Sequence, residues 1–306
     1  MDTLAGLADV FLVRDLGADA ISAVGVSQIV TMVIGVMMIS VSTGAFTMVA
    51  QAIGAGSPVE ASATTKQAFT LVTLVSIALS LIGIITSRFA LEMLSMPPAI
   101  IELGTAYLRV FFAGLVFMTL NFTLSNCLYG AGETRIPLYL NGVMALLKIA
   151  LSYLLIFGIG PFPELGVTGA ALSTVISRAA GFLLGMVLLY NGRLPLCLLP
   201  GTSYFPDWAR AQRMLRIGIP SAMQGLFRNG SGVVFLKLIA LTAAPVTAVA
   251  AYSIGNQMER IIRRTSLAFG TAATTLVGQN LGAQNQQAAV QSGWTATLVG
   301  ALSMAL

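Results

Sequence analysis

The chain has 306 residues, of which 57% are hydrophobic and only 9% are charged, with a formal net charge of +5. A soluble domain carries roughly 25% charged residues, so this composition indicates an integral membrane protein and excludes a soluble enzyme, a disordered chain and a disulfide-stapled secreted domain. The chain has no histidine and only two cysteines, Cys127 and Cys197, which excludes His-based catalysis and a Cys-rich zinc site.

Eight or nine apolar segments follow along the chain, and most are long enough for a helical membrane span, which needs roughly 20 apolar residues. Gly, Ala and Ser recur in them at helical rather than alternating spacing, which favours helices over transmembrane strands. A piece at 4–13, too short to span, comes first, and an apolar run from about 288 reaches the last residue. We therefore expect a fragment of a larger protein, or a start site assigned too late. The segments between them lie at about 21–50, 68–87, 105–128, 137–158, 167–190, 217–242 and 246–277.

A Pro- and Gly-rich region at 191–207 is the only long linker, and it divides the chain into two lobes. We expect an N-terminal lobe over 1–190 with helices one (partial) to six, a linker over 191–216, and a partial C-terminal lobe over 217–306 with helices seven to nine. The segment Asp207–Arg216 is predicted to form a short amphipathic helix along the membrane interface, with its first residue as the N-cap. A plain solvated loop is the alternative.

Basic residues gather in the loops at one side of the predicted spans. Because Lys and Arg are enriched in the cytoplasmic loops of membrane proteins, this side is expected to face the cytoplasm. The positive net charge then reflects membrane orientation rather than nucleic-acid binding. Loops at the other side hold Arg14 and Arg88, with Arg109 near that boundary. The cytoplasmic set is Lys66, Arg135, Arg193, Arg210, Arg213 and Arg216.

The chain contains an internal repeat at an offset of 228 residues. Val-Ala-Gln-Ala-Ile-Gly-Ala at 49–55 aligns without a gap with Val-Gly-Gln-Asn-Leu-Gly-Ala at 277–283, and both copies lie at the end of a long apolar run. Six helices separate the copies, so both run the same way through the membrane. This predicts a parallel repeat of two six-helix lobes, as in many transporters, with Gln51 and Gln279 as candidates for hydrogen bonds between helices. Chance similarity in an Ala- and Gly-rich sequence is the alternative.

Several motifs, in this order and spacing, resemble the multidrug and toxic compound extrusion (MATE) family of transporters. The resemblance covers nearly the whole chain, although each motif is weak on its own. The motifs are Ala8–Val13 (ADVFLV) followed by Leu16–Gly17 and Ala20–Gly25, Tyr129–Pro137 (YGAGETRIP), Leu165–Ala171 with Ser177–Arg178, Gly218–Ser221 (GIPS), and Gly278–Ala283 (GQNLGA).

This resemblance implies an all-α fold of twelve helices in two lobes, of which the chain runs from the second half of helix one into helix nine. It implies export of organic compounds, usually cationic or amphipathic, in exchange for H⁺ or Na⁺ by alternating access of the lobes. We therefore expect a multi-pass protein of a bacterial inner (plasma) membrane that acts as a monomer on a small organic substrate. It is expected to contact membrane lipids, to bind no nucleic acid, metal or cofactor beyond the coupling ion, and to have no enzymatic activity.

Asp9 is the main candidate for ion coupling. It is flanked by apolar residues in the remnant of helix one, and a charge at the bilayer centre costs roughly 2.5–3.5 kcal/mol, so such residues usually face a cavity or a partner. By resemblance it matches a first-lobe carboxylate linked to coupling; a fold-stabilising polar contact is the alternative. Many proton-coupled members have Asn and Asp where this chain has Lys148 and Ser152. We hypothesise that Lys148 pairs with Asp9, which would weaken simple proton coupling.

Helices seven and eight carry an excess of positive charge inside the predicted membrane region. Sodium-coupled members of the family have Glu where this chain has Arg228, and Arg263 and Arg264 replace apolar or Pro positions. Glu259 matches an acidic position of the family and stands four residues before Arg263, a favourable order for a helical ion pair. The excess predicts a cavity that accepts anions more readily than is usual in the family. Snorkelling to headgroups, or pairing with helices ten to twelve, is the alternative.

The remaining motif residues are expected to support the fold. Gly54 and Gly282 follow long apolar runs, where a glycine can end the helix and let the chain turn. Gly132 lies in the predicted turn between helices four and five. Pro220 is expected near the start of helix seven, where its missing N–H has no cost, and a bend used during transport is the alternative.

Three other functions were compared with drug export. A flippase or exporter for an anionic lipid-linked or organic-anion substrate is favoured by the cationic interior and disfavoured by the family motifs. A membrane-embedded enzyme would need clustered Asp, His or a Ser-based constellation, and the sequence has none of these. A non-transporting fragment or scaffold is the third possibility.

Overall fold

The computed structural model describes Leu12 and residues 17–305, except 95, 160–162, 193, 206 and 241–244, with only some of the side chains at 18, 29–38, 228–265 and 305. In this part of the chain, nine helices follow one another and no strand is present. The helices are α2 (Ala18–Gly54), α3 (Pro58–Met93), α4 (Pro98–Ala113), α5 (Leu115–Gly130), α6 (Arg135–Phe157), α7 (Gly166–Tyr190), α8 (Trp208–Ala240), α9 (Pro245–Gly282) and α10 (Gln286–Ala305).

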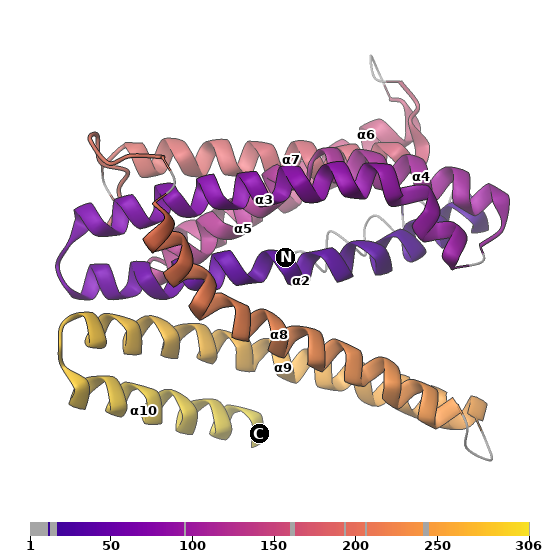
Figure 1. Ribbon diagram of the computed structural model, residues 1–306. Coiled ribbons are helices and arrows are strands. Elements are labelled where there is room, and N and C mark those ends of the chain that lie inside the picture. Colours follow the sequence, from indigo (N-terminus) through magenta and orange to yellow (C-terminus); the bar gives the residue numbers. More distant parts are fainter. Residues whose placement is uncertain are drawn as a thin grey trace.

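The helices form two groups that lie one above the other in Figure 1. α2 to α7 make up the first group and α8 to α10 the second, and the start of α8 (orange) crosses from the first to the second. The turns after α2, α5 and α9 lie beside the linker 191–207 at one end of the bundle, on the left of Figure 1, which we call the linker end. α3, α6 and α8 end at the opposite end.

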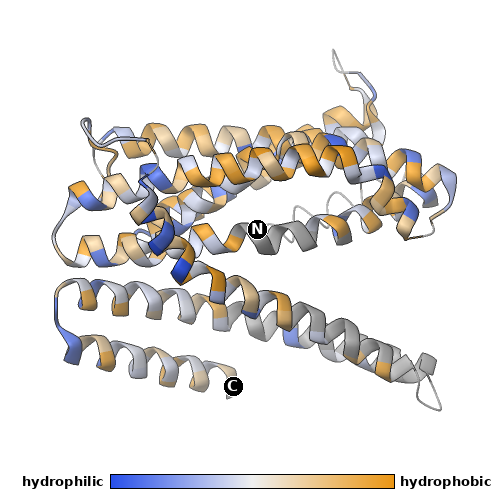
Figure 2. Ribbon diagram, in the orientation of Figure 1, coloured by the Kyte–Doolittle hydropathy of each residue, from blue (hydrophilic) through white to orange (hydrophobic). Residues whose placement is uncertain are grey.

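α3 is polar and small on its inner face and apolar on its outer face. Ser76, Ser80 and Ser87 are buried, whereas Leu81 and Ile85 are 58% and 78% exposed. Small inner residues allow helices to approach closely in a membrane, and an apolar outer face suits lipid. Figure 2 shows the same apolar surface along α3, α6 and α7.

Three helices of the described part, α3, α6 and α7, are long and apolar enough to cross a membrane, or four spans if α4 and α5 count as one. The sequence predicted one apolar segment over 105–128 in place of α4 and α5. They are instead bent by 51° at the break between them. At this break the side chain of Val175 occupies the space that a Cβ on Gly114 would need, so glycine permits the close packing of α7.

The expected start of helix seven near Pro220 is wrong. α8 begins at Trp208, and Pro220 lies inside it, so the amphipathic segment and the following span form one continuous helix. The predicted N-cap is confirmed, because Asp207 Oδ1 accepts a hydrogen bond from the N–H of Ala209 at 3.0 Å.

The internal repeat is reproduced in the hydrogen bonds of the two helix ends. The N–H of Ala55 donates to Gln51 O at 2.9 Å, and the N–H of Ala283, 228 residues later, donates to Gln279 O at 2.9 Å. The next two turn bonds also repeat, and both turns then pass through a positive φ, at Gly56 (64°) and at Gln284 (58°). The end of α5 shows the same three bonds and a positive φ at Gly132, so this turn is a common way to end a helix and does not by itself distinguish duplication from chance.

The linker is attached to α3 by a buried lysine. Lys66 is only 3% exposed, and its Nζ donates to the carbonyl oxygens of Leu199 (2.8 Å) and Thr202 (3.0 Å) and lies 4.9 Å from the ring centroid of Tyr204. Two carbonyl acceptors and an aromatic face satisfy the ammonium group, which would otherwise be costly to bury. Burial and a hydrogen bond with Tyr190 raise the pKa of the Tyr204 hydroxyl. The linker thus packs as an ordered part of the first lobe.

The start of α8 is attached to α3 as well. Arg210 donates through Nε and Nη2 to the two carboxylate oxygens of Glu60, at 3.1 and 2.9 Å. The backbone N–H of Asp207 lies 3.4 Å from Gln67 Oε1, one to two turns further along α3. The linker and the first turns of α8 are therefore held against the first lobe before α8 reaches the second.

Candidate functional site: the contact between the two repeats

The ends of α2 and α9 meet in a reciprocal contact between the two repeats. A Cβ on Gly54 would overlap the backbone of Gln279, and a Cβ on Gly282 would overlap the backbone of Gln51. Between these pairs, a Cβ on Gly278 would lie 2.7 Å from the Cβ of Ala50, its own counterpart in the repeat. At the centre, a residue meets its own counterpart in the other repeat. On either side, the same pair of motif positions is in contact, with the roles of the two repeats interchanged. This is the pattern that a two-fold axis produces. We call these six residues the axis contact.

The expected role of two glycines in the axis contact is corrected by this geometry. Gly54 and Gly282 are the last helical residues of α2 and α9, and neither has a positive φ. The turns are made two residues later, at Gly56 and Gln284. The two helix-end glycines therefore serve close approach of two backbones rather than helix termination.

The first turns of α8 also pack closely on α2. A Cβ on Gly218 would overlap the carbonyl group of Ser40, and a Cβ on Gly44 would overlap the backbone of Met214. Helices α8 and α9 thus both lie against α2 on glycine-lined surfaces. Such surfaces separate without the withdrawal of interlocked side chains, because glycine has none.

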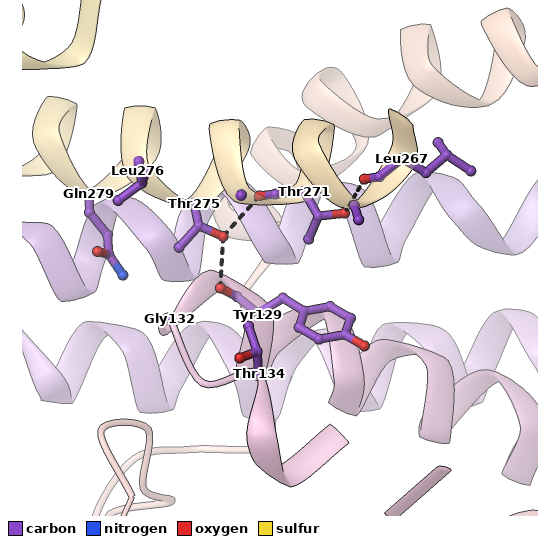
Figure 3. Close-up of a pocket in the computed structure, with 10 residues that line it drawn as sticks. Tyr129, Gly132, Thr134, Leu267, Thr271, Thr275, Leu276 and Gln279 are labelled. Atoms are coloured by element: carbon purple, nitrogen blue, oxygen red, sulfur yellow. Dashed lines mark hydrogen bonds between the residues drawn. The ribbon is translucent and has the colours of Figure 1, made fainter. Parts of the chain in front are cut away.

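Two hydrogen bonds join α9 to the end of α5. Thr275 Oγ1 donates to the carbonyl oxygen of Tyr129 at 2.9 Å (Figure 3). Gln279 Nε2 donates to the carbonyl oxygen of Gly130 at 3.1 Å. Both carbonyls belong to the last turn of α5, where carbonyl groups lack an intrahelical donor, and that of Tyr129 also accepts a hydrogen bond from the N–H of Gly132 in the turn. Gln279 therefore does bond between helices, whereas no hydrogen bond of the Gln51 side chain, which is exposed, is found in the described part.

A cavity of about 630 Å³ lies between the α5–α6 turn and the exposed face of α9. Figure 3 shows Tyr129, Gly132 and Thr134 on one wall and Thr271 and Thr275 on the other. Gly132 has a φ of 80°, which favours glycine and makes the sharp turn before α6. The wall is mostly apolar with a few hydroxyl and amide groups, a composition suited to small organic molecules.

The coupling candidates are placed only in part. Ser152 is fully buried on α6 and its hydroxyl lies 2.7 Å from that of Ser173 on α7. Lys148 is half-buried one turn earlier on α6. Asp9 lies outside the described residues, so its pairing with Lys148 stays a prediction.

The substrate-cavity candidates on α8 and α9 also stay predictions. Arg228, Arg263 and Arg264 lie on the helical backbone of α8 and α9, but their side chains are outside the described part. Glu259 is exposed on α9. Glu259 is not among the described residues that line the cavity of Figure 3. Among the described residues, no group of three His, Cys, Asp or Glu side chains could hold a metal ion.

The arrangement is that of a polytopic membrane protein of the repeat-built transporter class: long antiparallel helices with apolar outer faces, two parallel repeats and a small-residue surface between them. A family model described as MatE matches residues 1–154 and 220–306. The chain therefore belongs to the MatE family, as the sequence motifs predicted.

Individual relatives carry transporter names. The chain is 28% identical over 305 residues to "Probable multidrug resistance protein NorM" of Thermotoga maritima, covering 98% of this chain and 64% of the relative. It is 28% identical over 289 residues to an "FAD transporter" of Shewanella oneidensis, covering 94% and 63%. A solved structure of a multidrug resistance MATE transporter in an outward-facing conformation matches with a TM-score of 0.77 at 25% identity, covering 98% and 64%. The chain thus spans less than two thirds of the length of these relatives.

Proposed function

We propose that the protein is a secondary active exporter of small organic compounds, in which the two lobes rock about the axis contact to expose a shared cavity to each side of the membrane in turn. The observation that carries this proposal is the reciprocal backbone contact of α2 and α9. The two repeats touch there through glycine and alanine, with two side-chain hydrogen bonds beside them, from Thr275 and Gln279. Such a surface packs closely when the lobes are together, and the lobes can separate at a low cost in free energy.

We infer that the linker end faces the cytoplasm. Four arginines in or beside its turns and linker outnumber the two arginines near the opposite end, and cytoplasmic loops are rich in Lys and Arg. The axis contact then closes the cytoplasmic side, and the described conformation corresponds to an outward-facing state. The similarity to a structure with that description supports this inference. The arginines at the linker end are Arg135, Arg210, Arg213 and Arg216, and those near the opposite end are Arg88 and Arg109.

The energy source in this proposal is an H⁺ or Na⁺ gradient, with Asp9 as the carboxylate that exchanges the ion. The names of the multidrug resistance relatives support a small organic substrate. The localisation that follows is the inner (plasma) membrane of a bacterium, in keeping with the bacterial relatives.

An organic-anion substrate is the second candidate. One relative of similar identity is named an FAD transporter, and FAD carries negatively charged phosphates. Lys148, Arg228, Arg263 and Arg264 place positive charge on the helices that would line the shared cavity. This second candidate includes a flippase for an anionic lipid-linked substrate.

The test is dye efflux from everted vesicles that contain the intact protein. A fluorescent organic cation and a fluorescent anion are compared under imposed pH and sodium gradients, with Asp9→Asn beside the unaltered protein. Cation movement that is lost in Asp9→Asn supports cation export coupled through this carboxylate. Anion movement supports the second candidate, and movement of neither dye under either gradient contradicts secondary transport of both kinds.

A further inference from the structure

A second cavity, of about 360 Å³, lies at the linker end beside the axis contact. Its walls come from the end of α2, the start of α3, the first turns of α8 and the end of α9. It is separate from the cavity of Figure 3, with which it shares no lining residue. The residues that matter for its chemistry are Gln51, Glu60, Thr64, Arg213, Arg216 and Gly282.

The cavity carries an excess of positive charge. Arg213 and Arg216 are both exposed, stand one turn apart on α8, and have no ion-pair partner among the described residues. Among the described residues of the wall Glu60 is the only one with a carboxylate, and both of its oxygens accept hydrogen bonds from Arg210. Arg210 also lies 3.7 Å from the carboxylate of Asp207, so Glu60, Asp207 and Arg210 together carry one net negative charge. The guanidinium groups of Arg213 and Arg216 exceed it and leave a net positive charge for an anion.

A buried hydroxyl in the same wall lacks a partner. Thr64 is fully buried, and its Oγ1 has no hydrogen bond to any described residue. A buried polar group without a partner is costly and is usually satisfied by water or a ligand. An oxygen of a bound anion would supply the missing acceptor.

An exposed aromatic residue near the cavity indicates that it lies at the depth of lipid headgroups. Trp208 is 75% exposed at the start of α8, between two and three turns before Arg216. Exposed aromatic residues of this kind mark the membrane–water interface. Guanidinium groups bind phosphate through paired hydrogen bonds, which matches a pair of arginines at that depth.

We propose that this cavity binds a phosphate group, held by Arg213 and Arg216 and accepting a hydrogen bond from Thr64. The group can belong to the headgroup of an anionic phospholipid or be free inorganic phosphate, because both present the same oxygens. This proposal does not depend on the transport proposal.

The test measures thermal unfolding of the intact protein in detergent, with inorganic phosphate, with a short-chain phosphatidylglycerol, or with sodium chloride at equal ionic strength. The unfolding midpoint is expected to rise with at least one of the two phosphate compounds and not with chloride. A rise with the lipid alone assigns the site to a headgroup, and a rise with phosphate alone assigns it to the free ion. No rise with either compound overturns the proposal.

Three variants locate the site. Arg213→Gln/Arg216→Gln is expected to weaken the apparent affinity at least about tenfold, because it removes charge-assisted hydrogen bonds. Thr64→Val is expected to weaken it about fivefold without lowering the midpoint in the absence of ligand, since this hydroxyl has no partner to lose. Arg109→Gln removes the same charge near the opposite end and is expected to change nothing. Equal effects of all three variants, or full affinity in Thr64→Val and the double variant, overturn the assignment.

Discussion

Replacement of Gly54 by alanine is expected to open the linker end. The added Cβ would overlap the carbonyl group of Gln279 and lie 2.6 Å from its Cα, whereas carbon atoms pack at about 3.5–4.0 Å. α2 and α9 must therefore separate by about 1 Å at this point. Overpacking of this kind costs about 1–3 kcal/mol. Because the strain exists only when the axis contact is closed, the ratio of open to closed protein is expected to rise about 5- to 150-fold.

The reciprocal geometry makes a second, matched prediction. A Cβ on Gly282 would lie 2.8 Å from the carbonyl carbon of Gln51, so Gly282→Ala is expected to have a similar effect. The two changes act on one contact, and their effects are expected to combine with less than full additivity.

The assay is thiol labelling at position 275, which is 8% exposed in the closed contact. The protein carries Thr275→Cys, with Cys127 and Cys197 replaced by serine, and is treated in inside-out vesicles with a membrane-impermeant maleimide. The labelling rate is expected to rise in proportion to the open fraction.

Gly25→Ala on α2 and Gly255→Ala on α9 are the controls, since a Cβ at either position meets nothing within 4 Å. These two variants are expected to label at the parent rate. Labelling that stays at the parent rate in both Gly54→Ala and Gly282→Ala, or that rises equally in the controls, would refute the reasoning.

Further predictions concern the linker and the coupling residues. Lys66→Met is expected to lower the free energy of unfolding by about 1–3 kcal/mol, because two linker carbonyls lose their donor; thermal unfolding checks this, and a change no larger than in Lys66→Arg would contradict it. Glu60→Gln is expected to cost less than about 1 kcal/mol in the same measurement, because its pair with Arg210 is partly exposed; a loss as large as that of Lys66→Met would contradict this ranking. If Asp9 and Lys148 pair, Asp9→Lys/Lys148→Asp is expected to restore part of the transport that each single change abolishes, and an efflux assay with no recovery would argue against the pair.

The sequence was sufficient to predict the membrane-helical class, the parallel repeat and the family. These follow from long apolar runs and from a duplicated motif, both of which are visible without coordinates. The role of Gly54 and Gly282 was not predicted correctly, because a glycine at the end of a helix is most often there for the turn. The signal that could have suggested close approach was the repeat itself: two copies of one motif at the same end of parallel lobes lie at equal distances from their symmetry axis, and copies near the axis contact each other.

The attachment of the linker could not be predicted. Lys66 was assigned to a cytoplasmic loop, whereas it lies on α3 and is buried, and lysine is rarely buried without a partner. Its partners are backbone carbonyls of Leu199 and Thr202, which carry no sequence signature. Similarly, nothing in the Gly-Ile-Pro motif indicates that the short helix predicted over 207–216 continues without a break through Pro220. That continuity depends on the packing of α8 against α2 and α3.

The axis contact also limits how the duplicated halves can diverge. Off the contact the copies have drifted apart: Gly56 corresponds to Gln284, although both adopt a positive φ that disfavours a side chain. At the contact, Gly54 and Gly282 are still identical, because each faces the backbone of the other half, which cannot be shortened to make room. A larger residue in one half would have to be tolerated by the other. The two halves of the gene are therefore not free to evolve as separate units at these positions, and each inherits the constraint that the other imposes.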